Sequence, residues 1–212
     1  MILPTVLIGL SLLSASPDHI SILPLGTAEH GLMELLGREL ATRFMVPVKI
    51  LPAGKVPDYA YDPERGQYVS SAILDSMIGS PVAPAGAPGD RSQRSKRVNT
   101  AAGRVLAVVD VDLYADDLNF VFGQADIVDR AAVISLTRLR EEFYGRPANA
   151  AKSESRMIRE AVHELGHTYG LTHCQDPTCV MFFSNRLADT DRKSSYFCSE
   201  CRAKLARLMK RR

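Results

Sequence analysis

Most of the metal-binding side chains of this sequence are concentrated in one short segment. Three of the five histidines and all four cysteines fall between His163 and Cys201. Imidazoles and thiolates are the side chains that most often bind Zn2+ in proteins. A chain that folds around such ions has to bring these residues close together, whatever the rest of the sequence does. This segment therefore constrains the fold more than any other part of the chain.

The segment from His163 to His173 has the sequence HELGHTYGLTH. His163 and His167 are spaced so that both imidazoles leave the same side of a helix. Glu164 lies about 100° further round, where its carboxylate can reach a metal-bound water without binding the metal. Gly170 tolerates a positive φ, so it can end the helix and let His173 turn back to the same ion. Three neutral imidazoles leave one position of a tetrahedral zinc open, as in a catalytic site.

This pattern predicts acid–base chemistry at a carbonyl group. The carboxylate of Glu164 can take a proton from the attacking water and later pass it to the leaving amine. Apolar residues of the same helix lie opposite the two histidines, so the helix can bury one side and present the pair to a cleft. The alternative is a histidine-rich helix end without metal, in which Gly170 and His173 would serve no obvious packing purpose.

The cysteines form two pairs separated by a loop: Cys174, Cys179, Cys198 and Cys201. This spacing suits a closed site of four thiolates, which holds a structural rather than a catalytic zinc. Such an ion would tie the segment after the metal-binding helix to a C-terminal helix near Ser199–Met209. Since Cys174 directly follows His173, it would also hold that histidine in place. Two disulfide bonds and an iron–sulfur cluster remain the alternatives.

Hydrophobic patterning predicts alternating strands and helices along the rest of the chain. Buried strands are expected at His19–Leu25, Val46–Leu51, Arg104–Val111, Leu118–Gln124 and Ala132–Leu136. Helices are expected at Ala28–Phe44, Gln67–Ile78 and Ala150–Tyr169. This order predicts an α/β (α+β) fold with a sheet and crossover helices.

Composition and charge exclude several functional classes. The net charge is only +2, from 26 basic and 24 acidic residues, which gives no strong nucleic-acid signature. No apolar run reaches the ~18 residues of a membrane-spanning helix, so no membrane association is expected. The loop at 79–103 and the basic C-terminal run are interpreted as solvated surface, with a binding role as the alternative.

Residues 1–17 are expected to form an N-terminal extension. Met1–Leu13 is apolar but lacks the basic residues that begin a secretory signal. The cysteine spacing also suits metal binding better than disulfides. A cytoplasmic location is therefore expected, and secretion through a signal peptide at residues 1–16 is the alternative.

The metal-binding motif together with Met181 and the four cysteines resembles the archaemetzincins, a branch of the metzincin zinc peptidases. Three upstream stretches agree with this resemblance: Arg65–Tyr68, Leu118–Gly123 and Phe143–Gly145. The resemblance runs from His19 to the C-terminus. Residues 1–17, the loop at 79–103 and a gap before Cys198 that is one residue short depart from the family pattern.

The resemblance implies a metzincin-like fold with a twisted mixed sheet and one catalytic domain at 18–212. An upper subdomain at 18–170 would include the active-site helix, and a small lower subdomain at 171–212 would hold the structural zinc. Met181 would be the Met-turn residue beneath the catalytic zinc, although its residue type alone indicates core. Catalytic zinc ligands would be His163, His167 and His173, with Glu164 as general base. An edge strand that pairs with substrate would contain Asn119, Phe120, Val121, Phe122 and Gly123.

The function expected from these observations is that of a zinc metallopeptidase, either a metalloendopeptidase or an aminopeptidase-like enzyme. It would bind two Zn2+ per chain, act on peptides or unfolded polypeptides, and be a monomer. The alternative is a catalytically silent two-zinc module, whose cleft or basic C-terminus binds a peptide or a nucleic acid.

Overall fold

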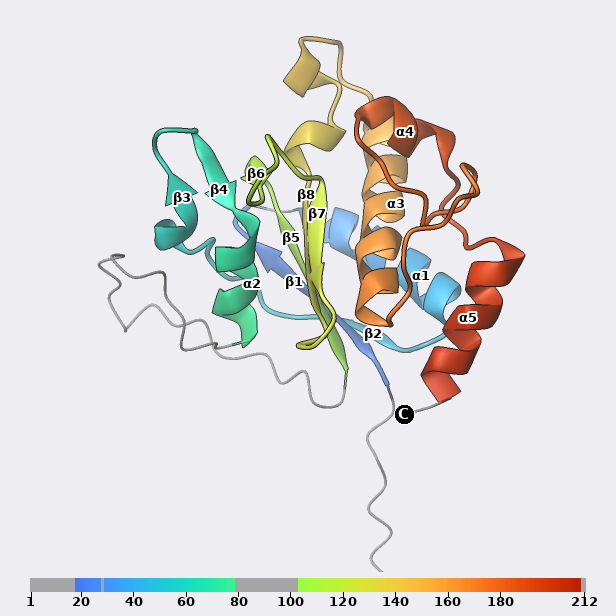
Figure 1. Cartoon of the computed structure of the whole chain (residues 1–212). Helices are drawn as coiled ribbons and strands as arrows, with labels where there is room; N and C mark the ends of the chain where they lie inside the picture. Colours follow the sequence, from blue (N-terminus) through green and yellow to red (C-terminus); the bar gives the residue numbers. More distant parts are fainter. Residues whose placement is uncertain (1–17, 28, 79–102, 211–212) are drawn as a thin grey trace, which may run out of the picture.

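The structure is a computed structural model that describes residues 18–27, 29–78 and 103–210. The strands of its main sheet are β1 (Ile20–Leu25), β2 (Val48–Ile50), β5 (Arg104–Val109), β7 (Gly123–Asp126) and β8 (Ala131–Ser135). They lie in the order β2-β1-β5-β8-β7, and the sheet is twisted (Figure 1). The first four strands in this order are parallel, and β7 is antiparallel to β8. The mixed sheet with helices confirms the predicted fold class.

The central strands are buried along their whole length. Every residue of β1, β5 and β8 is buried, because helices cover both faces of this part of the sheet. The register places Ile22 beside Leu106 and Leu106 beside Ala132. These three side chains belong to the larger of two hydrophobic clusters. The apolar runs that predicted buried strands thus form the centre of the molecule.

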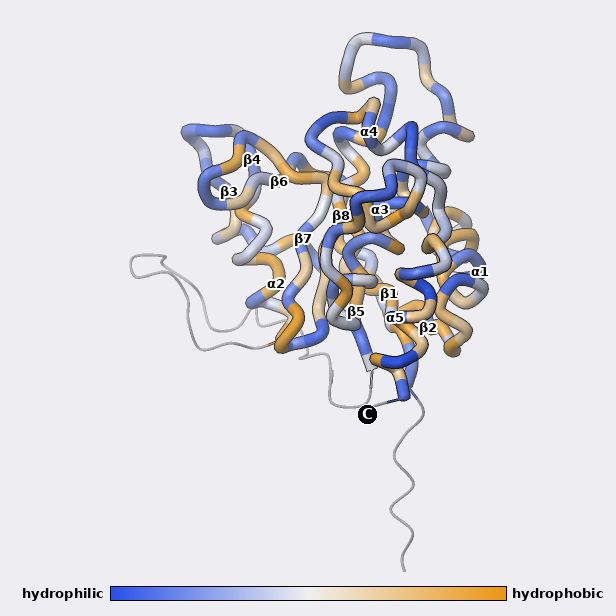
Figure 2. Tube along the Cα trace, turned by 45° about the vertical axis from the view of Figure 1, so that its right-hand side comes forward, coloured by the Kyte–Doolittle hydropathy of each residue, from blue (hydrophilic) through white to orange (hydrophobic). Residues whose placement is uncertain are grey.

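Helices cover the two faces of the main sheet. α1 (His30–Phe44) and α3 (Ala150–Thr168) pack on one face, and α2 (Ser70–Ile78) packs on the other. Hydrophobic and polar residues alternate along α1 in Figure 2, as expected for a helix that is half-buried against a sheet. The structure confirms α1 and α3 close to their predicted ends, although Ala28 lies outside the described residues.

A second sheet corrects the predicted start of α2. It contains β3 (Tyr61–Asp62), β4 (Gln67–Val69) and β6 (Leu113–Tyr114). Residues 67–69, predicted as helix, are therefore extended. The Gln67 side chain donates hydrogen bonds to Asp112 Oδ2 and to the carbonyl of Asn119. These partners are far away in the sequence, so no local pattern predicts that residues 67–69 form a strand.

The predicted strand at Leu118–Gln124 is also partly wrong. Regular pairing begins only at Gly123, and β7 then continues to Asp126. Of the predicted edge residues Asn119–Gly123, only Gly123 lies in β7. The strand at the end of the sheet is therefore shifted toward the C-terminus.

Contacts with the smaller sheet, and with the turn between its strands β3 and β4, explain this shift. The carbonyl oxygens of Leu118 and Asn119 both accept hydrogen bonds from Arg65 Nη2 at 3.2 Å. Val121 makes an isolated bridge to Leu113. Residues 118–122 are thus held by side chains and single contacts, and a regular ladder starts after them.

The chain after α3 contains α4 (Leu187–Arg192) and α5 (Ser199–Lys210). α5 confirms the predicted C-terminal helix. α4 was not predicted, because its sequence LADTDR has no apolar periodicity. Short 3-10 helices lie at Asp58–Ala60, Thr137–Leu139 and Glu142–Tyr144.

Arg156 connects the first half of α3 to two other parts of the chain. Its side chain is almost completely buried, and its Nε and Nη2 atoms each lie 2.7 Å from Asp191 of α4. Nη2 also donates to Glu141 at 2.7 Å, and Nη1 donates to the Leu139 carbonyl at 2.9 Å. A buried guanidinium is tolerated because it is paired and hydrogen-bonded in this way.

We expect the contribution of Glu141 to stability to disappear in acid. Hydrogen bonds from Arg146, Arg156 and Lys152 lower the pKa of this carboxyl from 4.5 to about 2. Because the folded-state pKa is the lower one, the stabilisation is present above pH 4.5 and is lost as the pH falls toward 2. Glu141→Gln should therefore lower the melting temperature at neutral pH, and its difference from wild type should shrink in that acid range. Thermal melts test this with the exposed Glu142→Gln as control, and a constant difference across the range contradicts it.

Some predictions fall on residues that the structure does not describe. These are the N-terminal extension at 1–17, the signal-peptide alternative at 1–16 and nearly all of the loop at 79–103. Among the helices of residues 18–27, 29–78 and 103–210, none combines the length and apolar character that crossing a membrane requires.

Candidate active site

The second half of α3 carries the histidine motif into the interior. Asn149 caps the start of the helix, where its side chain accepts a hydrogen bond from the Lys152 N–H at 3.0 Å. Gly170 follows its end with φ of 95°, a conformation that favours glycine. Seven successive residues from Glu160 to Gly166 are buried. The helix is thus buried on both sides here, rather than on the one side predicted, because the chain after Gly170 covers the histidine side.

The three histidines of the motif come together as predicted. His163 is buried, His167 is half-buried and His173 is exposed. One ring nitrogen from each histidine lies within 4.8 Å of the others. His163 Nδ1 lies 2.8 Å from the Val180 carbonyl, and His167 Nδ1 lies 2.7 Å from the Leu171 carbonyl. Because a carbonyl only accepts, both Nδ1 atoms carry the proton and both Nε2 atoms present a lone pair.

The distance between these lone pairs fits a bound metal ion. His163 Nε2 and His167 Nε2 are 3.1 Å apart. Two lone pairs at this distance repel each other unless a cation binds both. Two nitrogen ligands of a tetrahedral zinc, each at about 2.0–2.1 Å, lie about 3.4 Å apart. Burial also lowers the pKa of all three imidazoles, which favours the neutral form that binds metal.

Glu164 lies beside this cluster and is also buried. Burial raises the pKa of its carboxyl to about 8; the nearby Glu160 carboxylate also raises it, and Lys193 lowers it. A carboxyl group whose pKa is near neutrality is suited to accept and release a proton. Gly123, the first residue of β7, packs closely against the Glu164 side chain.

We expect Gly123→Ala to impair activity without removing the metal. An added Cβ would lie 2.7 Å from both Glu164 Cγ and the Val133 carbonyl oxygen. The carbonyl belongs to β8 and cannot move aside, so Glu164 must shift. A displacement of about 1 Å can cost about 100-fold in rate, so kcat/KM should fall by that order. Gly31→Ala is the control, because an added Cβ there meets no atom within 4 Å. If Gly123→Ala keeps the wild-type kcat/KM, then Gly123 is not needed to leave room for Glu164.

Met181 packs directly against the histidine-bearing turn of α3. A Cβ at Gly166 would lie 2.5 Å from Met181 Sδ, so the glycine makes room for the methionine. The Cys174 N–H donates to the Met181 carbonyl at 2.9 Å, which fixes the backbone there. This position agrees with the Met-turn expected from the resemblance, and its role stays a prediction.

The four cysteines form a second cluster. Each is free, and one sulfur atom from each lies within 4.8 Å of the others. The Sγ atoms of Cys174 and Cys198 are 3.8 Å apart. A disulfide requires about 2.05 Å, whereas two thiolates at about 2.3 Å from one zinc lie about 3.8 Å apart. The disulfide alternative is therefore wrong for this structure, and the cluster fits a single ion.

Backbone hydrogen bonds support thiolates in this cluster. The Cys198 N–H donates to Cys179 Sγ at 3.3 Å, and the Cys201 N–H donates to Cys198 Sγ at 3.5 Å. The second of these bonds lowers the pKa of the Cys198 thiol, whereas burial raises the pKa values of Cys179 and Cys201. A bound cation would supply the charge that keeps all four sulfurs ionised.

Glu160 and Lys193, two residues beside the histidine cluster, were missed by the sequence analysis. Glu160 lies one turn before Glu164 and forms a buried ion pair with Lys193. Lys193 lies in a run of polar residues, which predicts exposure, and only the tertiary structure shows that it is buried. Phe183, which flanks Met181 in the sequence and is expected to line the specificity pocket or the core, lies against His173, with ring centroids 4.8 Å apart. The one sequence pattern that could have indicated the missed residues is the spacing of Glu160 from Glu164, which places Glu160 one helical turn before the predicted base.

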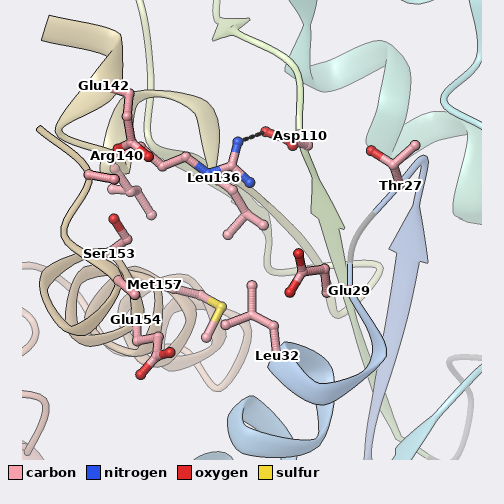
Figure 3. Close-up of a pocket in the computed structure, with 13 residues that line it drawn as sticks. Thr27, Glu29, Leu32, Asp110, Leu136, Arg140, Glu142, Ser153, Glu154 and Met157 are labelled. Atoms are coloured by element: carbon pink, nitrogen blue, oxygen red, sulfur yellow. Dashed lines mark hydrogen bonds and ion pairs between the residues drawn. The ribbon is translucent and has the colours of Figure 1, made fainter. Parts of the chain in front are cut away.

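A cavity of about 400 Å³ lies away from both clusters. Figure 3 shows it between the ends of β1 and β5 and the first turns of α1 and α3, with Thr27, Glu29, Asp110 and Arg140 around it. Arg140 donates to Asp110 at 2.6 Å. None of the histidines or cysteines of the two clusters lines this cavity.

Comparison with known proteins identifies relatives over most of the chain. The profile of peptidase family M54 matches residues 38–207. The archaemetzincin of Methanocaldococcus jannaschii is 39% identical over 187 residues, which cover 88% of this chain and 92% of the relative. The archaemetzincin of Pyrococcus furiosus is 36% identical over 195 residues, with 89% and 92% covered.

Solved structures agree with these sequence relatives. The crystal structure of the archaemetzincin from Methanopyrus kandleri has a TM-score of 0.73 and 32% identity, and covers 94% of this chain and 99% of its own. The archaemetzincin from Archaeoglobus fulgidus, complexed with malonate, has a TM-score of 0.68 and 35% identity, with 88% and 99% covered. The chain therefore belongs to peptidase family M54 and, like the archaemetzincins, is a zinc metallopeptidase.

Proposed function

We propose that the histidine cluster is where this metallopeptidase hydrolyses peptide bonds, with Glu164 as the general base. The observation that carries this proposal is the pair of Nε2 lone pairs 3.1 Å apart, next to a buried carboxyl group. His163, His167 and His173 would hold the ion. Zinc held there supplies Lewis-acid activation of water and of the scissile carbonyl.

The protein's own residues then move one proton. Glu164 takes it from the attacking water and delivers it to the nitrogen of the leaving amine. Gly123 leaves room for the carboxyl group on the β7 side. The carbonyls of Val180 and Leu171 hold His163 and His167 in the tautomer that leaves Nε2 free to bind metal. Burial of Glu164 keeps bulk water from competing for its proton.

The position of β7 supports an extended peptide as substrate. It is the last strand in the order of the main sheet, and its first residue contacts Glu164. A peptide can pair with the open edge of such a strand through backbone hydrogen bonds. We therefore propose that the substrate lies along Gly123–Asp126, whereas the resemblance implied an edge strand at Asn119–Gly123.

The cysteine cluster is proposed to hold a second, structural zinc. It joins the chain after α3 to α5 and adjoins His173, so it would support residues 171–212 as a small C-terminal unit. Free thiols fit a reducing compartment, which supports a cytoplasmic location. A monomeric state and the absence of a nucleic-acid partner stay predictions.

A cleavage assay tests the proposed function. A library of unfolded peptides is incubated with zinc-loaded protein, with chelator-treated protein and with treated protein to which zinc is returned. We expect cleavage only in the first and third samples, together with two zinc ions per chain in metal analysis. If zinc-loaded protein binds library peptides and cleaves none of them, the silent binding module replaces this proposal.

A further inference from the structure

Lys193 follows α4, and its side chain is completely buried, with 0% exposed. Taking an ammonium group out of water is costly unless it is paired and hydrogen-bonded. Lys193 Nζ lies 3.1 Å from Glu160 Oε1 and donates to the Phe182 carbonyl at 3.5 Å. The Thr190 hydroxyl donates to the same Glu160 oxygen at 2.9 Å. The charge is thus compensated by groups from two separate elements.

Both partners of Lys193 belong to segments that hold His163 in place. Glu160 lies on α3, one turn before His163. Phe182 lies two residues after Val180, whose carbonyl accepts the Nδ1–H of His163 at 2.8 Å. These contacts close a ring from His163 through Val180, Phe182, Lys193 and Glu160, which returns to His163 along the helix.

We propose that Lys193 is a positioning residue for the peptidase reaction. By holding the Phe182 carbonyl and the Glu160 carboxylate together, it fixes where the Val180 carbonyl meets His163. The orientation and tautomer of a metal-binding imidazole are set by the partner of its other nitrogen. This inference rests on the proposed function of the histidine cluster.

The competing explanation is that the Lys193–Glu160 pair only stabilises the fold. Lys193→Met alone cannot decide this, because it leaves Glu160 buried without a counter-ion and should lower the melting temperature strongly. The double variant Lys193→Met/Glu160→Met removes both charges at similar volume, so we expect most of the melting temperature to return. In this double variant the Phe182 carbonyl still lacks its hydrogen-bond donor, so the ring of contacts stays open. Thr190→Val is the matched control, because it removes a donor to Glu160 and leaves the ring closed.

We expect the folded double variant to have a kcat about 10-fold below wild type, the lower end of the usual cost of losing a partner of a metal ligand, because the Val180 carbonyl is kept and only its position is no longer fixed. KM should be nearly unchanged, and Thr190→Val should behave as wild type. The second measurement is the NMR signal of the His163 Nδ1–H in the zinc-loaded protein. It should be sharp in wild type and Thr190→Val, and broadened by exchange with water in the double variant.

A folded double variant with wild-type kcat and a sharp His163 Nδ1–H signal would overturn the positioning role. The NMR measurement needs no turnover, so it separates this inference from the proposed function. If wild type cleaves no peptide, the proposed function fails. The NMR signal then decides by itself whether Lys193 fixes the contact between the Val180 carbonyl and His163.

Discussion

Glu164→Gln is expected to lower kcat by about 10²–10⁴-fold, the usual contribution of a general base. Glutamine has nearly the same shape as glutamate, but its amide accepts no proton at working pH. Glu164 is not among the residues whose ligand atoms form the histidine cluster, so zinc content and KM should stay at their wild-type values. Steady-state kinetics on a peptide cleaved by wild type, together with metal analysis of each sample, measure these quantities.

The control for this substitution is Glu154→Gln, the same chemical change ten residues earlier on α3. It should leave kcat and zinc content unaltered. If Glu164→Gln keeps kcat within a few-fold of wild type, another group must accept the proton, and Glu164 is not the base.

The same substitution should stabilise the metal-free protein in mild alkali. The folded-state pKa of Glu164, about 8, is raised above the ordinary carboxyl value of 4.5, mainly by burial. The folded protein therefore resists ionisation of this group, and stability falls as the pH rises from 4.5 through 8. A glutamine avoids that cost, so metal-free Glu164→Gln should melt higher than wild type above pH 8. Such a gain is typical of a group that is kept for chemistry at the expense of stability.

Cys198→Ser is expected to have the largest effect on stability. Structural zinc sites contribute about 10–16 kcal/mol in small zinc-binding domains, as much as the whole stability of about 5–15 kcal/mol of a typical domain. Losing one thiolate should therefore release the second zinc and unfold the chain after α3, which carries His173. We expect one zinc or none per chain, a broad melting transition at lower temperature and loss of peptidase activity.

Ala203→Ser is the control, because it introduces the same hydroxyl at an exposed position of α5. It should keep both zinc ions and the wild-type melting temperature. If Cys198→Ser melts like wild type, the cluster does not hold a structural ion. Alkylation of metal-free protein without reductant should modify all four cysteines, since none is paired in a disulfide.

The chemistry of the histidine site could be predicted because its geometry is local. His163, Glu164 and His167 are placed by the 3.6-residue period of a helix, and the turn to His173 depends on Gly170 with its positive φ. Covalent spacing and helix geometry fix these positions relative to one another without a contact from another element. The buried strands were also predictable, because continuous apolar runs mark a sheet that is covered on both faces.

The start of the edge strand β7 could not be predicted from the local sequence. The sequence LNFVFGQ predicts a strand from Leu118, but regular pairing starts at Gly123. The difference comes from Arg65, which binds carbonyl groups 53 and 54 residues away. The pattern of residues within 118–124 cannot reveal a contact with a residue so far away in the sequence.

The sequence by itself determined which residues can bind metal, which helix presents them and which strands form the core. Only the tertiary structure decided the tautomers of His163 and His167, the packing of Gly123 on Glu164, and the burial of Lys193. The physical reason is the range of the interactions. Spacing along one helix acts over a few residues, whereas each of the latter features requires groups from different elements to meet inside the folded chain.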